Sequence, residues 1–144
     1  MSEPTTIDGG CHCGNIRFEL LWPADEAGIQ ARCCGCTFCQ KHGGSWTSNR
    51  GAQLNVTIED RSTVSNYRFG TRTADFQVCS ICGVVPLVSS EIDGDRYAVV
   101  NTNTFRKHAG FTLTSTSTDF DDEDTDSRLD RRKRKWIPRV VIVE

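Results

Sequence analysis

Eight cysteines in 144 residues constrain this chain more than any other feature of its sequence, because they gather in three tight clusters. They are Cys11, Cys13, Cys33, Cys34, Cys36, Cys39, Cys79 and Cys82. Residues 1–6 contain neither a cationic nor an apolar stretch, so we expect no secretory signal and a cytoplasmic protein whose thiols stay reduced. Clustered thiols in a reducing compartment favour metal binding over disulfides.

Two of the clusters have the form of short chelating loops, C-x-C and C-x-x-C. Two thiolates this close in sequence can bind one metal ion at about 2.3 Å each, and four thiolates from two such loops close a tetrahedral zinc site. Gly14 and Gly83 follow the pairs and permit tight turns that direct backbone N–H groups toward sulfur. An iron–sulfur cluster, disulfides and free thiols are the alternatives.

The middle cluster places three cysteines on one loop in a C-x-C-x-x-C run. The three are Cys34, Cys36 and Cys39. Cys33 does not fit this run, since adjacent residues of an extended chain point to opposite sides. Three protein ligands with an open fourth position characterise a catalytic zinc site, whereas four ligands characterise a structural one. The alternative is a second structural site with a fourth ligand from His42 or elsewhere.

Three stretches of the chain together resemble the glutathione-dependent formaldehyde-activating enzymes and their centromere protein V relatives. The stretches read G-C-H-C-G-N-I at residues 10–16, C-G-C-T-F-C at residues 34–39 and C-S-I-C-G-V at residues 79–84. Each alone is a weak signal, but their order and spacing are specific. The resemblance covers about residues 8–105 and implies an Mss4-like β fold.

The resemblance also implies two zinc ions per chain and an activity. The structural zinc would be bound by Cys11, Cys13, Cys79 and Cys82. The catalytic zinc would be bound by Cys34, Cys36 and Cys39. The family's named activity is that of a carbon–sulfur lyase, which adds glutathione to formaldehyde and yields S-(hydroxymethyl)glutathione. The implied partners are therefore a small-molecule thiol, glutathione or a similar compound, and an aldehyde.

The hydrophobic pattern predicts a mainly β fold. Residues 15–22 alternate between apolar and polar side chains, as a half-buried strand does. Further short strands are expected at residues 54–59, 64–69, 74–78, 84–88 and 97–101, with a loop at 23–28 and a hairpin turn at 93–95. Pro86 indicates a sheet edge or a bulge, and Thr37 is the expected N-cap of a short helix over residues 37–42. We expect a small zinc-stabilised β domain of short antiparallel strands with one or two short helices.

The composition changes beyond residue 111. Residues 112–118 are almost all Thr and Ser, residues 119–126 contain six acids, and residues 128–139 contain seven bases and one acid. These charges can form two solvated surfaces that pack against each other. The alternative is that residues 131–135 form a nuclear-import signal or a nucleic-acid-binding patch, whose positive charge the neighbouring acids would screen. Residues 140–143 are apolar enough for a final strand. We expect residues 1–144 to form one domain, with 112–144 packed on it.

The overall charge narrows the classes of function. Seventeen Lys and Arg against 19 Asp and Glu give a net charge of −2, which argues against nucleic acid as a partner. No apolar run approaches the ~18 residues of a membrane span. The leading hypothesis is an enzyme that handles thiol–aldehyde adducts, with a substrate thiol in the open position of the middle cluster. The alternative is a non-catalytic zinc-stabilised β domain that binds a protein or nucleic acid.

Glutathione carries two carboxylates, so its pocket should contain a cation. The candidates, taken by their distance in sequence from the middle cluster, are Lys41 and Arg50, and then Arg68, Arg72 and Arg106. A proton must also reach the hydroxyl that forms when a thiol adds to an aldehyde. His42 or water could deliver it.

Overall fold

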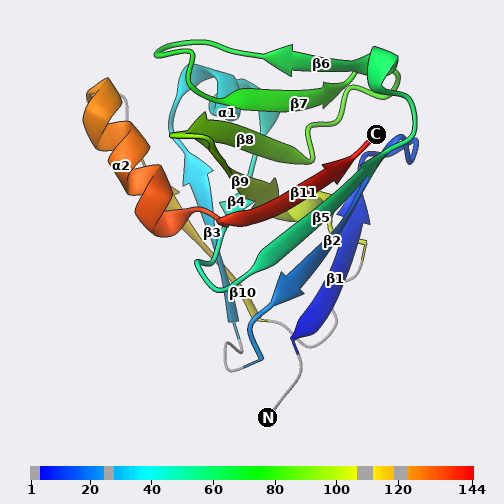
Figure 1. Cartoon of the computed structure of the whole chain (residues 1–144), viewed down its shortest axis with the longest axis horizontal. Helices are drawn as coiled ribbons and strands as arrows, with labels where there is room; N and C mark the ends of the chain where they lie inside the picture. Colours follow the sequence, from blue (N-terminus) through cyan, green and yellow to red (C-terminus); the bar gives the residue numbers. More distant parts are fainter. Residues whose placement is uncertain (1–3, 25–27, 107–111, 119–122) are drawn as a thin grey trace.

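The computed structural model describes residues 4–24, 28–106, 112–118 and 123–144. The described chain is mainly β, as predicted, and forms two sheets, one with strand order β1-β2-β5-β11 and one with order β10-β3-β4-β9-β8-β7-β6 (Figure 1). The smaller sheet consists of β1 (Thr5–Gly10), β2 (Ile16–Trp22), β5 (Gln53–Ile58) and β11 (Arg139–Val143). The larger sheet consists of β3 (Gly28–Cys34), β4 (Trp46–Thr47), β6 (Val64–Tyr67), β7 (Asp75–Cys79), β8 (Leu87–Ile92), β9 (Asp95–Asn101) and β10 (Thr112–Thr118).

Two α-helices and two short 3₁₀ turns complete the described elements. They are α1 (Thr37–His42), α2 (Thr125–Lys135), η1 (Arg61–Thr63) and η2 (Thr102–Thr104). Neither α-helix has the length and apolar character that crossing a membrane requires. In Figure 1, α2 stands at the left of the molecule, and the arrowhead of β7 points away from it toward the right.

Strand β2 is buried as its alternating sequence predicts. Ile16, Phe18, Leu20 and Trp22 are all at most 4% exposed, and the residues between them are less buried. The strand lies between β1 and β5, antiparallel to both. Its apolar face belongs to one core cluster with Leu87 and other residues of the larger sheet, so the two sheets pack on a shared core. Burying each such side chain contributes about 1.5–3 kcal/mol.

The turn between β8 and β9 confirms the predicted hairpin. Asp93 and Gly94 have φ values of 53° and 86°, and Ile92 pairs directly with Asp95. Two consecutive residues with positive φ form the type I′ turn that matches the right-handed twist of the flanking strands. Asp and Gly are among the residues that adopt this conformation most readily.

The segment around Pro86 differs from its prediction. Strand β8 begins at Leu87, not at residue 84, and it lies between β7 and β9 in the interior of the sheet. The expected edge or bulge position for Pro86 is therefore wrong. The proline stands just before the first strand residue, where its missing N–H removes no ladder hydrogen bond, and its carbonyl accepts from the backbone of Asn101 at 2.8 Å.

Strands β1 and β3 were not among the predicted elements, because Asp and two Gly in β1 and Gly and Ala in β3 are residue types that strands contain rarely. Strand β1 is fixed by six pairs with β2, and β3 by pairing with β10 in parallel. Of the loop predicted at residues 23–28, residues 25–27 lie outside the described part of the chain.

The charged C-terminal segment is held to the sheets by apolar residues that follow α2. Trp136 and Ile137 are buried, and Ile137 exchanges two backbone hydrogen bonds with Ala98 of β9. Strand β11 then pairs in parallel with β5, which confirms the predicted final strand. These contacts place α2 on the body of the molecule, so its charged side chains can reach a site there.

Candidate metal centres and the adjoining cavity

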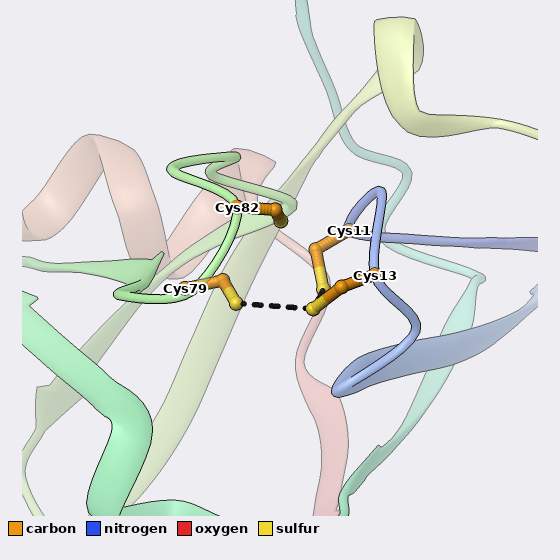
Figure 2. A group of neighbouring side chains, drawn as sticks. All are labelled: Cys11, Cys13, Cys79 and Cys82. Carbon is orange, nitrogen blue, oxygen red and sulfur yellow. Dashed lines mark hydrogen bonds between the residues drawn. The ribbon is translucent and has the colours of Figure 1, made fainter.

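The four-cysteine cluster brings together two loops that are far apart in sequence. Its members are Cys11, Cys13, Cys79 and Cys82, whose sulfurs all lie within 4.8 Å of one another. Figure 2 shows the two loops facing each other. Cys13 Sγ lies 3.5 Å from Cys79 Sγ and 3.7 Å from Cys11 Sγ. A tetrahedron with Zn–S bonds of about 2.3 Å has S···S edges of about 3.8 Å. The four thiols therefore fit a tetrahedral metal ion.

Backbone hydrogen bonds shape the two loops alike. The amide of Gly14 donates to the carbonyl of Cys11 at 3.2 Å, and the amide of Gly83 donates to the carbonyl of Cys79 at 2.7 Å. Both glycines have positive φ, 86° and 81°, where a side chain would be strained. The amide of Ile16 also donates to Cys11 Sγ at 3.3 Å, which favours a charged sulfur.

The pKa values of this cluster move in opposite directions. A hydrogen bond from the Asn15 backbone lowers the pKa of Cys13, but partial desolvation and the neighbouring thiols, led by Cys79, raise it by more, to about 12. Desolvation raises the pKa of Cys82, whereas backbone hydrogen bonds, first from Val84, and the other thiols lower it to about 6. Four thiols this close resist ionising together, and a divalent cation among them offsets their repulsion.

The three-cysteine cluster comes from one continuous segment. Cys34 is the last residue of β3, Cys36 directly precedes α1, and Cys39 lies inside α1; their sulfurs lie within 4.8 Å of one another. The amide of Cys36 donates to Cys34 Sγ at 3.5 Å. Gly43, at φ 83°, ends the helix and donates to the carbonyl of Cys39 at 2.7 Å. One helical turn thus fixes the relative positions of two of the three thiols.

The N-cap of α1 corrects one prediction. The helix covers residues 37–42 as expected, but Cys36 and not Thr37 is its N-cap. Cys36 Sγ accepts from the amide of Cys39 at 3.4 Å, so a thiol takes the role that an oxygen usually has. The cap hydrogen bond and the helix N-terminus both favour negative charge on this sulfur.

Burial opposes ionisation in the three-cysteine cluster. The pKa of Cys39 is raised, first by the hydrogen bond with the Cys34 thiol and then by burial. Burial also raises the pKa of Cys36, although its hydrogen bonds with Cys39 act in the other direction. As in the first cluster, a soft divalent cation suits three thiolates in this arrangement.

Neither His42 nor Cys33 joins the three-cysteine cluster. His42 is exposed and stacks on Phe38, with ring centroids 5.4 Å apart and planes inclined by 16°. Cys33 is exposed and lies outside the group. Among the described residues, no fourth side-chain ligand completes this cluster. None of the eight cysteines forms a disulfide.

A cavity of about 340 Å³ opens beside the three-cysteine cluster. Cys34, Cys36 and Cys39 all line it, and none of the four-cysteine cluster does. Its volume lies in the range of small-molecule sites, about 300–1,000 Å³. Its apolar wall consists of Trp46, Phe69, Ala74, Phe76, Val88, Val99 and Trp136. The cavity therefore joins three thiols to a largely apolar space.

The cations of the cavity are different from those expected. None of the five cations that the sequence suggested for glutathione binding lines the cavity. Two of the five have partners elsewhere, since Arg68 pairs with Asp75 and Arg50 donates to the carbonyl of Lys133. The basic residues of the wall are Arg32, Arg128, Arg131 and Arg132. Three of them stand at i, i+3 and i+4 on α2, so they share one face of the helix. That spacing was visible in the basic run of the sequence.

Two comparisons with known proteins bear on these features. The sequence profile described as glutathione-dependent formaldehyde-activating enzyme matches residues 6–118. The crystal structure of a Rhodobacter sphaeroides protein is similar to this chain, with a TM-score of 0.53 and 25% sequence identity over 76% of this chain and 99% of that one. The profile match includes all eight cysteines and ends before α2.

Proposed function

This chain belongs to the glutathione-dependent formaldehyde-activating enzyme family, and we propose that it is a zinc-dependent carbon–sulfur lyase that adds glutathione to formaldehyde. The observation that carries the proposal is the cavity lined by all three thiols of the three-cysteine cluster. Substrates can approach such thiols, whereas none of the cysteines of the four-cysteine cluster lines this cavity. The product is S-(hydroxymethyl)glutathione, and a related thiol is the other substrate compatible with the site.

The two clusters have separate roles in this proposal, and the chain binds two zinc ions. The structural zinc ligands are Cys11, Cys13, Cys79 and Cys82. The catalytic zinc ligands are Cys34, Cys36 and Cys39. Zinc held by three thiolates supplies positive charge that keeps a substrate thiol deprotonated and nucleophilic. The Cys36 cap and the α1 turn keep the three protein sulfurs oriented toward the cavity.

The cavity wall supplies the remaining conditions for the addition. Trp46 and Phe76 pack edge to face, with centroids 5.9 Å apart, and form an apolar surface on the wall of the cavity that the three thiols also line. The new bond joins the substrate sulfur to the aldehyde carbon, and the carbonyl electron pair moves to oxygen. The thiol loses one proton and the new hydroxyl gains one. Because His42 lies outside the cavity, water delivers this proton.

The alternative, a non-catalytic zinc-stabilised β domain that binds a protein or nucleic acid, needs no ligand position open to a cavity. The three-member cluster and the space beside it therefore support the enzyme. We also propose that the chain acts in the cytoplasm as one domain, since a reducing compartment keeps its eight cysteines out of disulfides.

The test is the rate of adduct formation by zinc-loaded protein. Glutathione and formaldehyde are mixed, and the hydroxymethyl carbon is followed by NMR against the uncatalysed reaction. The wild type should accelerate the reaction, and Cys36→Ser should lose at least about a hundredfold of the acceleration. Cys33→Ser is the matched control, because Cys33 is the exposed neighbour outside the cluster. Equal activity of Cys36→Ser and wild type would overturn the proposal.

A further inference from the structure

The charged wall of the cavity comes mainly from α2, which lies beyond the part of the chain matched by the family profile. The profile ends at residue 118, and α2 spans Thr125–Lys135. Arg128, Arg131 and Arg132 nevertheless line the same cavity as the three thiols. The match to the family therefore says nothing about this wall, and its chemistry has to be inferred from the contacts of these side chains.

A carboxylate already lies against two of these arginines. Arg131 makes a two-pronged contact with Glu123: its Nε lies 3.2 and 3.1 Å from the two carboxylate oxygens, and its Nη2 lies 3.0 Å from Oε1. Arg128 Nε lies 3.6 Å from the same Oε1. The side chains are only 16–18% exposed. Planar guanidinium groups recognise carboxylates in this geometry, and partial burial strengthens the attraction.

Arg132 adds a buried cation to the wall. It is 6% exposed, and its Nη1 donates to the hydroxyls of Thr73 at 2.8 Å and Ser90 at 3.2 Å. Its guanidinium carbon lies 4.9 Å from the ring centre of Trp136. Its Nε has no hydrogen-bond partner among the described residues. A buried guanidinium bonded to neutral hydroxyls retains its full charge, so an anion entering the cavity is attracted to it.

The arginines also affect one another. Burial, and after it the charges of Arg131 and Arg128, lower the pKa of Arg132 to about 10. This means that the positive charges of the wall repel one another in the low-dielectric cavity. Glu123 acts in the opposite direction, as a negative charge in the same wall. A second carboxylate from a ligand would reduce the repulsion further.

We propose that Arg128, Arg131 and Arg132 form a carboxylate subsite that makes this enzyme selective for thiol substrates bearing carboxylates, and that Glu123 occupies the subsite until the substrate binds. The inference rests on the proposed function, because it uses the same cavity. The subsite identifies the substrate class by its charge. The sulfur of the substrate lies at the three-cysteine cluster, while a carboxylate of the same substrate molecule replaces Glu123 on Arg131. Neutral thiols and esterified glutathione lack the group that these arginines bind.

The test measures binding without turnover. Zinc-loaded full-length protein is titrated in a calorimeter with S-methylglutathione and with its diethyl ester. Neither probe has a free thiol, so the comparison reports on the carboxylates. The wild type should bind the acid at least about tenfold more tightly than the ester. Arg131→Gln should lose about tenfold in affinity for the acid and leave the affinity for the ester unchanged.

Two further variants separate recognition from a merely structural role. Glu123→Gln breaks the same ion pair as Arg131→Gln, so a structural role would weaken binding in both variants. The subsite instead requires opposite effects, with Glu123→Gln binding the acid severalfold more tightly, because the competing carboxylate is removed.

Arg134→Gln is the matched control: Arg134 is on α2, is 62% exposed, pairs with Asp130 and does not line the cavity. It should bind both probes like the wild type.

The outcomes distinguish this inference from the proposed function. If the wild type forms no adduct but binds the acid in an Arg131-dependent way, the subsite stands and the lyase activity does not. If the wild type forms the adduct but binds acid and ester equally, or if Arg131→Gln binds like the wild type, the subsite is overturned and the activity stands. Failure of the wild type to bind S-methylglutathione also overturns the subsite. Circular dichroism of each variant verifies that α2 remains folded.

Discussion

The two cysteine clusters contain the same kind of ligand but differ in how they are built. The four-cysteine cluster joins the loop after β1 to the end of β7, and Cys13 and Cys79 are 66 residues apart. The three-cysteine cluster lies on one segment from the end of β3 into α1. A metal that links distant segments closes a long loop of chain, whereas one bound within a short segment closes almost none. The first cluster is therefore suited to stability and the second to chemistry.

The surroundings of the two clusters also differ, one lying against the core and the other facing a cavity. The turns of the four-cysteine cluster pack against the shared core of the two sheets, where Cys11 and Cys79 are buried. The three-cysteine cluster faces a cavity with aromatic and arginine walls. A site that only holds the fold together has no need of such a space, and a site that meets substrates requires one.

The largest predicted effect is the loss of the fold on Cys82→Ser. Zinc binding by structural thiolate sites is worth about 10–16 kcal/mol in zinc-finger peptides, as much as the whole stability of a typical domain, about 5–15 kcal/mol. We expect the variant to lose most of its native circular dichroism signal and both zinc ions. A folded Cys82→Ser protein with a cooperative thermal transition near that of the wild type would contradict the structural role of the four-cysteine cluster.

The next largest effect is confined to activity. Cys36→Ser should keep the wild-type circular dichroism spectrum and melt within a few degrees of the wild type, because its cluster links no distant segments. It should retain one zinc ion and lose the catalytic acceleration. Thermal melting with metal analysis makes the measurement, and Cys33→Ser serves again as control. If Cys36→Ser unfolds like Cys82→Ser, the two clusters have the same role.

The two clusters should also release their zinc ions to a chelator at different rates. A site with three protein ligands and access from a cavity releases its ion to a chelator more readily than a closed site of four. We expect a coloured chelator to take one zinc ion per chain in a phase at least about tenfold faster than the second. Activity should be lost with the fast phase, and native circular dichroism with the slow phase. Loss of structure in the fast phase contradicts this assignment.

The smallest predicted effects come from one glycine beside each cluster. Gly83 and Gly43 have φ values of 81° and 83°, and a Cβ at either would meet nothing within 4 Å. Substitution by Ala therefore adds only backbone strain, about 1 kcal/mol at each position. Chemical denaturation should give similar losses for Gly83→Ala and Gly43→Ala, with zinc content unchanged. A much larger loss for Gly43→Ala would mean that the α1 turn contributes more to the fold than its cluster suggests.

Much of this arrangement could be predicted from the sequence, because it depends on local patterns. The cysteine spacings predicted which thiols would meet, and the alternation from Ile16 to Trp22 predicted a buried strand face. The Asp93–Gly94 turn followed from the need for positive φ at two residues in succession. In the strand and the turn a few neighbouring residues determine the outcome, whereas the meeting of two cysteine pairs that are far apart in sequence was predicted from their matching loops and from the family resemblance.

The parts that were missed depend on contacts between distant segments. The arginine face of α2 reaches the cavity because Trp136 and Ile137 fix the helix to the larger sheet, and nothing in residues 128–135 alone indicates this. Similarly, Thr37 is a residue type that is common at N-caps, but Cys36 takes the cap position, where its sulfur accepts from the Cys39 amide. The interior position of Pro86 follows from the strands on either side of β8.

The most direct test of the two-cluster account is the zinc content of wild-type and Cys36→Ser protein, both purified under reducing, chelator-free conditions. The account predicts two zinc ions per folded chain in the wild type and one in the variant, with the same circular dichroism spectrum. One zinc ion in each would mean that the three-cysteine cluster holds no metal, and the division between a structural and a catalytic site would be contradicted.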